Sequence, residues 1–274
     1  VGVVKSGEAS GKLNEVLKSL ASEVEKMALI RKKIRGAMIY PLFIMCVLVI
    51  VVAGMLVFVV PKLSEVFEQT DQQLPLLTRV VIGASDVVQN FWPLLLVGVA
   101  LIWLGLAVGR KTRLLKRPID EFVVRVPIFG PLVQKSLLAR FAHSFANLLH
   151  AGIPIVEALH INAKTLGNEV YKERVLLAAE DLSRGIPLAE SLRDSTLFPP
   201  LLVQMIAIGE QTAQLDSVSM KIAEYYEEEV DIAVQNFTKI LEPVIIVAVG
   251  SSVGVIVASI MLPIIKLIDI SEAL

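Results

Sequence analysis

The sequence predicts an all-α, polytopic membrane protein with three transmembrane helices and cytoplasmic antiparallel helical-bundle domains. Three observations lead to this fold class. The chain of 274 residues contains three long runs almost without charge, its other segments have the periodicity of amphipathic helices, and no useful length alternates like a strand. Hydrophobic residues make up 55% of the chain, and its mean hydropathy of +0.69 is too high for an ordinary soluble domain.

An internal repeat organises the chain. The phrase GEASGKL lies near the N-terminus, and GEQTAQL lies far downstream. When the two phrases are aligned without gaps, Pro41 falls on Pro243 and Pro61 falls on Pro263. Because Gly and Pro mark the ends of elements, this shared punctuation indicates two copies of a turn, a long helix and an apolar segment.

Three apolar runs are candidates for membrane spans, at residues 39–60, 91–109 and 244–265. The first has 22 residues without a charge. At about 1.5 Å per residue it measures roughly 33 Å, which is enough to cross a hydrocarbon core of about 30 Å. A buried helix of a soluble protein is the alternative interpretation of each run.

Basic residues predict the orientation of these spans. RKKIR precedes the first span and RKTRLLKR follows the second, whereas segment 61–90 carries only Lys62 and Arg79 against four acidic residues. Because Lys and Arg are enriched in cytoplasmic loops, we expect 61–90 to lie outside and 110–243 to lie inside.

These boundaries divide the chain into seven segments. Residues 1–38 are the last helix of an incomplete first cytoplasmic domain, 39–60 are a span, and 61–90 are a periplasmic segment. Residues 91–109 are a second span, 110–243 are a second cytoplasmic domain, 244–265 are a third span, and 266–274 are a short external tail. Since the chain begins partway through a repeat, we expect the rest of the first domain to precede Val1 in the full gene.

Turn residues predict how the second cytoplasmic domain folds. VPIFGPL (126–132) and STLFPP (195–200) interrupt regular structure, and GIPIVEAL recurs as GIPLAESL. Each Gly suits a helix end and each Pro suits the first turn of the next helix, so the recurring unit is a helix hairpin. We expect a short helix at 200–209, and then a long helix that runs into the third span and breaks only at Pro243.

The sequence offers little chemistry. Glu157 and His160 form an ExxH pair, but no second acidic pair accompanies them, so we interpret them as ordinary surface positions. No phosphate-binding loop is present, and the three spans carry no ionisable residue of the kind that transporters use. We predict no enzymatic activity, cofactor or metal. A membrane transporter is the less favoured alternative, and the net charge of −1 gives no indication of nucleic-acid binding.

Three groups of residues are candidates for interactions. The first is an acidic stripe on one face of the last long helix, which either docks a basic partner or is a solvated face. The second is a set of small residues where helices could meet, within one chain or between subunits. The third is the Gly-Glu phrases, which we expect to set turns and cap the following helices. The acidic stripe consists of Glu224, Glu227, Glu228 and Asp231. The small residues are Gly105, Gly109, Gly250, Gly254 and Ala258. The Gly-Glu phrases contribute Gly7, Glu8, Gly11, Gly209 and Glu210.

Longer phrases carry a family resemblance. LARFAHSFANLLHAGIPIVEAL, FPPLLVQMIAIGEQTAQLD and EYYEEEVDIAVQNFTKILEPVIIVAVG resemble the inner-membrane platform proteins of type IV pili and type II secretion systems, the PilC/GspF family. In that family's pattern a second Gly follows each Gly-Glu. Gly11 matches this pattern, but Ala213 departs from it, and alanine tolerates a positive φ angle poorly.

The resemblance implies a function and a set of partners. It implies a multi-pass protein of the bacterial inner membrane, the platform of type IV pilus assembly, that couples a cytoplasmic hexameric ATPase to pilin insertion or extraction. The equivalent platform of a type II secretion system, acting on pseudopilins, is the alternative. The resemblance also implies contacts with other inner-membrane assembly proteins, with the lipid bilayer and with further copies of the chain in a homo-oligomer.

Overall fold

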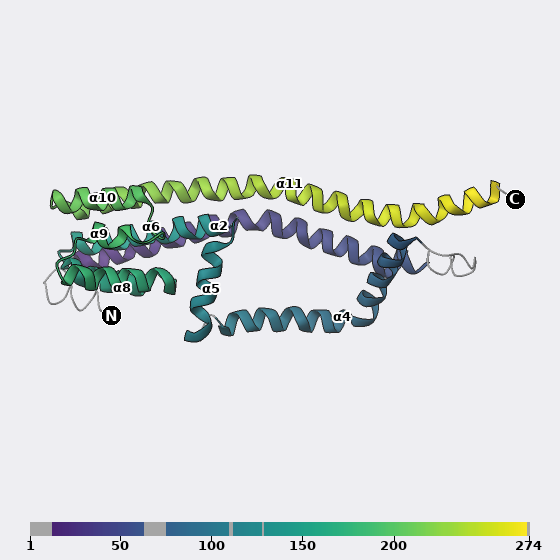
Figure 1. The fold of residues 1–274 in the computed structure, drawn as a ribbon, viewed down its shortest axis with the longest axis horizontal. Helices are drawn as coiled ribbons and strands as arrows, with labels where there is room; N and C mark the ends of the chain where they lie inside the picture. Colours follow the sequence, from purple (N-terminus) through teal and green to yellow (C-terminus); the bar gives the residue numbers. More distant parts are fainter. Residues whose placement is uncertain (1–12, 63–74, 110–111, 128, 273–274) are drawn as a thin grey trace. The chain divides into compact units, whose positions relative to one another are not determined.

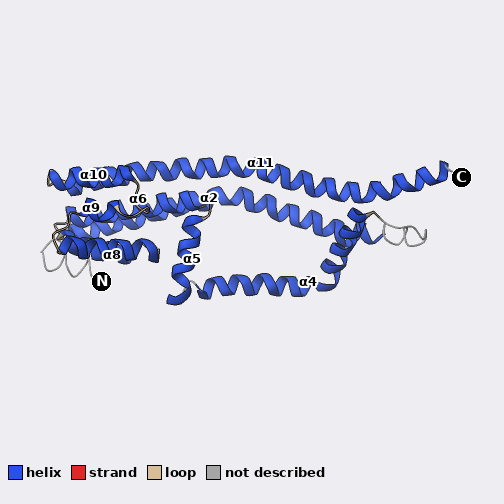
Figure 2. Ribbon diagram, in the orientation of Figure 1, coloured by secondary structure: helices blue, strands red, loops and turns tan. Residues whose placement is uncertain are grey.

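A computed structural model provides the fold of this chain. It describes residues 13–62, 75–109, 112–127 and 129–272. Every regular element in these ranges is helical (Figures 1 and 2), as the all-α prediction requires. The chain divides into two compact units, which comprise Val1–Ala37 with Gly109–Phe237, and Met38–Val108 with Thr238–Leu274.

The first unit is built of packed helices. Its elements are the beginning of α2 (Leu13–Gly54), α5 (Arg113–Arg125), α6 (Gly130–His150), α7 (Ile155–Thr165), α8 (Glu169–Ser183), α9 (Leu188–Arg193), α10 (Pro200–Gln211) and the beginning of α11 (Leu215–Glu272). Helices α6 to α10 pack against their neighbours in chain order, and α5 contacts both α6 and α8. Four aromatic rings meet in the core: Phe141 lies 5.6 Å from Phe145 and 5.3 Å from Phe198, and Phe198 lies 5.7 Å from Tyr171.

The predicted helix hairpins form at the expected glycines. Gly152 and Gly185 have φ angles of 78° and 89°, a left-handed conformation that glycine adopts without penalty. Pro154 and Pro187 are the N-cap residues of α7 and α9. The two GIP phrases therefore act as the sequence predicts, each closing one helix and opening the next.

The beginning of α2 packs onto this bundle. Met27 and Ile30 of α2 form a small buried cluster with Leu132 of α6 and Val230 of α11. The helix that the sequence assigns to an incomplete first domain thus shares a core with the second domain.

The second unit contains almost all of the three long apolar runs. It contains the remainder of α2, the π-helix η1 (Met55–Val59), α4 (Leu76–Gly109) up to Val108, and the remainder of α11. Helices continue through Pro41, Pro93 and Pro243, so the expected break at Pro243 is not present. Helix α4 bends by 53° just after Pro93 (Figure 1), as expected where a proline removes one backbone hydrogen bond.

Two of the described helices are long and apolar enough to cross a membrane. They contain Val24–Lys62 and Leu215–Leu262. The first range includes the first predicted span, and the second covers residues 244–262 of the third. The second predicted span lies in the bent helix α4, which qualifies only if its two halves count together. The bent pair of α5 and α6 would likewise qualify only as a pair. By length and composition, the described residues therefore offer two to four candidate spans.

Polar side chains of α4 bind backbone carbonyls of its neighbours in the second unit. Thr78 donates a hydrogen bond to the carbonyl oxygen of Ser259 on α11, at 2.9 Å. Ser85 donates to the carbonyl of Leu56 in η1, and Gln89 donates to Ser85 Oγ at 2.9 Å. These contacts fix the first half of α4 against η1 and α11. This half includes residues 76–90, so the predicted boundary at 90 is not a helix boundary.

Candidate functional site

The acidic stripe of α11 is divided between two environments. Glu227 accepts hydrogen bonds from Lys26 Nζ at 3.0 and 3.1 Å, and Asp231 accepts from Lys33 Nζ at 2.7 Å. Both lysines lie on α2, so these two acids hold α2 to α11. Glu224 and Glu228 are exposed. Of the four acids, Glu224 and Glu228 are therefore the two that are exposed and are not bound to α2.

The surroundings of the exposed Glu224 favour its ionised carboxylate. Lys221 Nζ lies 2.8 Å from its carboxylate, one helical turn away. This hydrogen bond, with the charge of Lys221, lowers the pKa of Glu224. Glu224 is therefore ionised at neutral pH, and its negative charge lies beside the positive charge of Lys221.

A buried histidine lies beside the contact between α2 and α11. His143 on α6 is only 2% exposed, and its Nδ1 lies 2.9 Å from the side-chain amide nitrogen of Asn147. Burial lowers the pKa of His143, and the positive charge of Lys26 lowers it further, while Glu227 opposes the shift. The ring is therefore held neutral.

The Gly-Glu phrase at α10 caps a helix, but not the one that follows it. The carboxylate of Glu210 accepts hydrogen bonds from the backbone N–H groups of Leu188 at 2.6 Å and Ala189 at 3.0 Å. Glu210 therefore caps α9, whereas the sequence predicts a cap for α11. The side chain satisfies two N–H groups that have no partner within their own helix.

The turn that joins α10 to α11 is left-handed despite its alanine. Ala213 has a φ angle of 56° and is the one non-glycine residue with positive φ in the described part of the chain. The backbone N–H of Gln214 donates to the carbonyl of Gly209 at 2.9 Å. A side chain on Gly209 would meet Leu215 Cδ2 at 3.1 Å, so Gly209 permits this close approach. Gly7, Glu8 and Gly11 lie outside the described residues.

The small residues differ in what surrounds them. A methyl group added to Gly105, Gly250 or Gly254 would meet no atom within 4 Å, and all three are exposed. Ala258 is half-buried. Gly109 is buried against α5, because an added methyl group would lie 3.3 Å from Ile119 Cδ1. A helix-packing role for this stripe remains a prediction.

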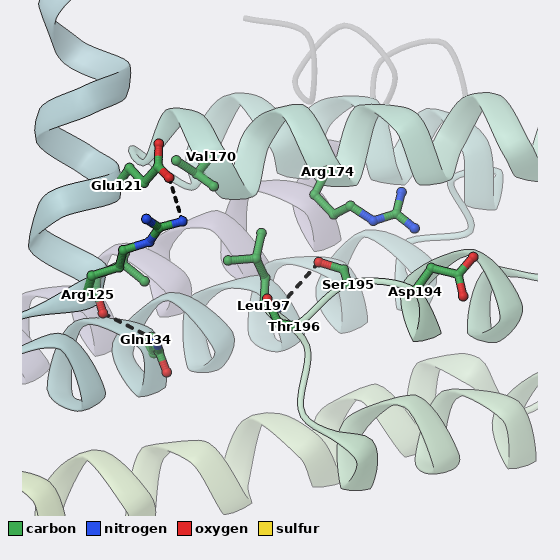
Figure 3. Close-up of a pocket in the computed structure, with 10 residues that line it drawn as sticks. Glu121, Arg125, Gln134, Val170, Arg174, Asp194, Ser195, Thr196 and Leu197 are labelled. Atoms are coloured by element: carbon green, nitrogen blue, oxygen red, sulfur yellow. Dashed lines mark hydrogen bonds and ion pairs between the residues drawn. The ribbon is translucent and has the colours of Figure 1, made fainter. Parts of the chain in front are cut away.

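A cavity of about 400 Å³, lined by both polar and apolar side chains, opens between α5, α6, α8 and the loop after α9 (Figure 3). At one side Arg125 pairs with Glu121 at 2.7 Å. At another, Arg174 donates to Ser191 Oγ at 3.2 Å, and Asp194 lies nearby on the cavity wall. The sequence did not single out this cavity, because its lining comes from four separate elements.

The histidines do not assemble a metal site. His160 is exposed, and its Nδ1 lies 2.8 Å from the carbonyl oxygen of Val156, within its own helix. No cluster of three His, Cys, Asp or Glu residues suited to a metal ion occurs in the ranges that the structure describes.

Comparison with known families decides the relationship. The profile described as "Type II secretion system (T2SS), protein F" matches residues 1–61 and 141–263, more than half of the chain. The chain belongs to this family. The two matched segments end at Pro61 and Pro263, which are the prolines that the internal alignment superimposes.

This chain is similar to several named proteins. It is 41% identical to "Type IV pilus assembly protein PilC" of Thermus thermophilus, over 98% of the chain and 66% of the relative. It is 37% identical to the protein of the same name in Pseudomonas aeruginosa, over 97% of the chain and 71% of the relative. It is 36% identical to "Type II secretion system protein F" of that organism, over 96% of the chain and 65% of the relative. The chain thus spans about two thirds of the length of these relatives.

Two features of this family member were missed by sequence reasoning. The ion pair of Lys26 and Glu227 joins residues 201 positions apart, and nothing local to either residue indicates the other. Glu210 reaches back to α9 across 22 residues. A signal for the second feature was present, because the repeated GIP phrase left a helix start without a Ser, Thr, Asp or Asn cap.

Proposed function

We propose that this chain is the greater part of an inner-membrane platform for type IV pilus assembly, which couples a cytoplasmic hexameric ATPase to pilin insertion or extraction. The observation that carries this proposal is similarity along almost the whole chain to proteins named for pilus assembly, at 37% and 41% identity. A type II secretion platform is the second candidate, favoured by the relative named protein F at 36% identity.

We further propose three spans, at 39–60, 91–109 and 244–265, with segment 61–90 outside and 110–243 in the cytoplasm. The candidate spans in α2 and α11 support two of these crossings. The bias of Lys and Arg supports the orientation. The chain carries no phosphate-binding loop, so a non-catalytic role with energy from a partner fits its composition.

An exchange experiment separates the two candidate functions. Pseudomonas aeruginosa has a relative of each kind, at similar identity, and this makes a matched pair of hosts. The full-length protein should restore surface pili to a strain without its pilus assembly protein, and should not restore secretion to a strain without protein F. Restored secretion without pili would favour the second candidate, and failure in both hosts, with the protein present in the membrane, would count against both.

The acidic stripe is our proposed contact for a basic surface of the ATPase. The structure allows a sharper test than removal of all four charges, because Glu227 and Asp231 already pair with α2. The variant Glu224→Gln with Glu228→Gln should co-purify less ATPase at low salt, with little change in thermal stability. Exposed charges act chiefly on association and its salt dependence.

Two control variants make this test specific. Glu227→Gln with Asp231→Asn should instead loosen α2 and lower stability, since it removes both ion pairs. Glu180→Gln with Glu190→Gln removes two exposed charges elsewhere in the bundle and should leave recovery of the ATPase unchanged. If the Glu224 and Glu228 variant recovers as much ATPase as the wild type at every salt concentration, the stripe is only a solvated face.

A further inference from the structure

Helix α5 buries Val124 in the core, but a second apolar face of the helix is turned away from the other helices. Leu115 and Phe122 are 53% and 69% exposed, and Pro118, on the same helical face, is also exposed. An amphipathic helix of a soluble bundle places such a face against the core. Here the face is unpartnered, and Phe122 is among the most exposed large apolar side chains of its unit.

The opposite side of α5 faces the other helices, where it buries Val124 and carries charged side chains that bind α8. Asp120 accepts a hydrogen bond from the backbone N–H of Glu169 at 2.8 Å, and Lys116 pairs with the carboxylate of Glu169 at 3.1 Å. Arg117 pairs with Glu173 at 3.1 Å. The helix is therefore anchored to α8 by its charges, and this anchoring leaves its apolar face directed outward.

We infer that the outward face of α5, formed by Leu115, Pro118 and Phe122, lies in the surface of the lipid bilayer. An amphipathic helix can lie in the interface plane with its apolar residues about 5–10 Å into the boundary of headgroups and acyl chains. The occupant of this face is thus the cytoplasmic leaflet of the membrane. The inference rests on the proposed membrane orientation.

The place of α5 in the chain supports this occupant. Gly109, the last residue of α4 and of the second proposed span, accepts hydrogen bonds at its carbonyl from the N–H and hydroxyl of Thr112, at 3.2 and 3.0 Å. Gly109 also packs against Leu115 and Ile119. The apolar face of α5 therefore begins where the span ends. Within its unit, α5 then turns by 110° relative to α6 (Figure 1).

Charge also fits a lipid surface. Residues 110–117, RKTRLLKR, contain five basic residues and no acidic residue. Clusters of Lys and Arg immediately cytoplasmic to a span attract anionic headgroups. The two acids on α5 are occupied, since Asp120 binds the N-terminus of α8 and Glu121 pairs with Arg125 at 2.7 Å. Basic residues next to exposed Leu and Phe are the composition of interfacial helices.

Lipid quenching of single labels tests this inference. Cys46 is the sole cysteine of this chain, so Cys46→Ser, with any cysteine of the preceding segment also replaced by Ser, gives a clean background for the full-length protein in nanodiscs. A fluorophore is attached at Phe122→Cys, at the matched control Leu177→Cys on α8, which is 51% exposed, or at Val51→Cys in the first proposed span. The discs contain phosphatidylcholine alone or with phosphatidylglycerol, each with and without lipids that carry a nitroxide on the acyl chain.

The expected result is loss of fluorescence at positions 122 and 51 with nitroxide lipids, and no loss at 177. The loss at 122 should be larger in discs with phosphatidylglycerol. A label at 122 that behaves like the label at 177, while 51 is quenched, would overturn the inference and leave the proposed spans intact. Absence of quenching at 51 would instead overturn the spans as well. A label at 122 shielded from both aqueous iodide and nitroxide lipid would show that protein, such as a second copy, covers this face.

Discussion

Removing the charge of Glu210 should loosen α9 from its cap. The carboxylate accepts from the backbone N–H groups of Leu188 and Ala189, at 2.6 and 3.0 Å. In Glu210→Gln one oxygen can still accept, but the amide nitrogen cannot, so one N–H group beside buried Ala189 loses its partner. A lost helix cap costs about 0.5–2 kcal/mol, and an unsatisfied buried donor costs about 1–3 kcal/mol. We therefore expect a loss of about 1–2 kcal/mol.

Two measurements on the full-length protein in detergent check this magnitude. Thermal unfolding should begin at a lower temperature, and hydrogen exchange should accelerate in a peptide that covers residues 186–193. Glu190→Gln is the matched control, because Glu190 is exposed on the same short helix. If Glu210→Gln and Glu190→Gln exchange and unfold alike, the capping role of Glu210 is incorrect.

Three further predictions use the same unfolding assay. Gly130→Ala should destabilise by about 1–3 kcal/mol, because the added methyl group would overlap the carbonyl oxygen of Val124; an unchanged midpoint would contradict this. Ala213→Gly should stabilise the folded protein by less than about 1 kcal/mol. Relief of the left-handed alanine is worth roughly 1–2 kcal/mol, which exceeds the cost of about 0.5–1 kcal/mol from the greater chain entropy of glycine in the unfolded state. A loss of stability would contradict this prediction. The lowered pKa of His143 means that the unfolded chain binds its proton more readily. The stability that the neutral ring contributes is therefore present above pH 6.5, the ordinary histidine pKa, and it declines as pH falls through the lowered pKa of the folded state. This decline should be weaker in His143→Gln. Parallel pH profiles of the variant and the wild type would refute the prediction.

Local signals predicted the two helix hairpins well. Gly152 and Gly185 are followed by Pro154 and Pro187, and the helix hairpins form there because the backbone conformations of these residues are strongly restricted. The left-handed Ala213 was harder to foresee. Its local preference is overridden by the close packing of α10 on α11.

Long-range features were less accessible to sequence reasoning. The helices continue through Pro41 and Pro93, since neighbouring groups in an apolar setting can satisfy the freed carbonyls. Two acids of the stripe, Glu227 and Asp231, are paired with α2. A charge in a sequence does not indicate its partner, so the stripe's pattern could not distinguish a docking surface from an internal ion pair.

The π-helix η1 gives the first apolar helix tolerance to a change in length. A π turn holds one residue more than an α turn can accommodate, and η1 spans five residues at Met55–Val59. Deleting one residue there would restore an α turn and leave the residues beyond it near their present rotation, whereas a deletion in a regular α turn would shorten the helix by about 1.5 Å and rotate the residues beyond it by about 100°. The hydrogen bonds of Ser85 and Gln89 at Leu56 oppose that rotation. The π turn is therefore the place in this helix where the loss of one residue can be absorbed, and a deletion elsewhere would change the rotational phase with which the end of the helix meets α4.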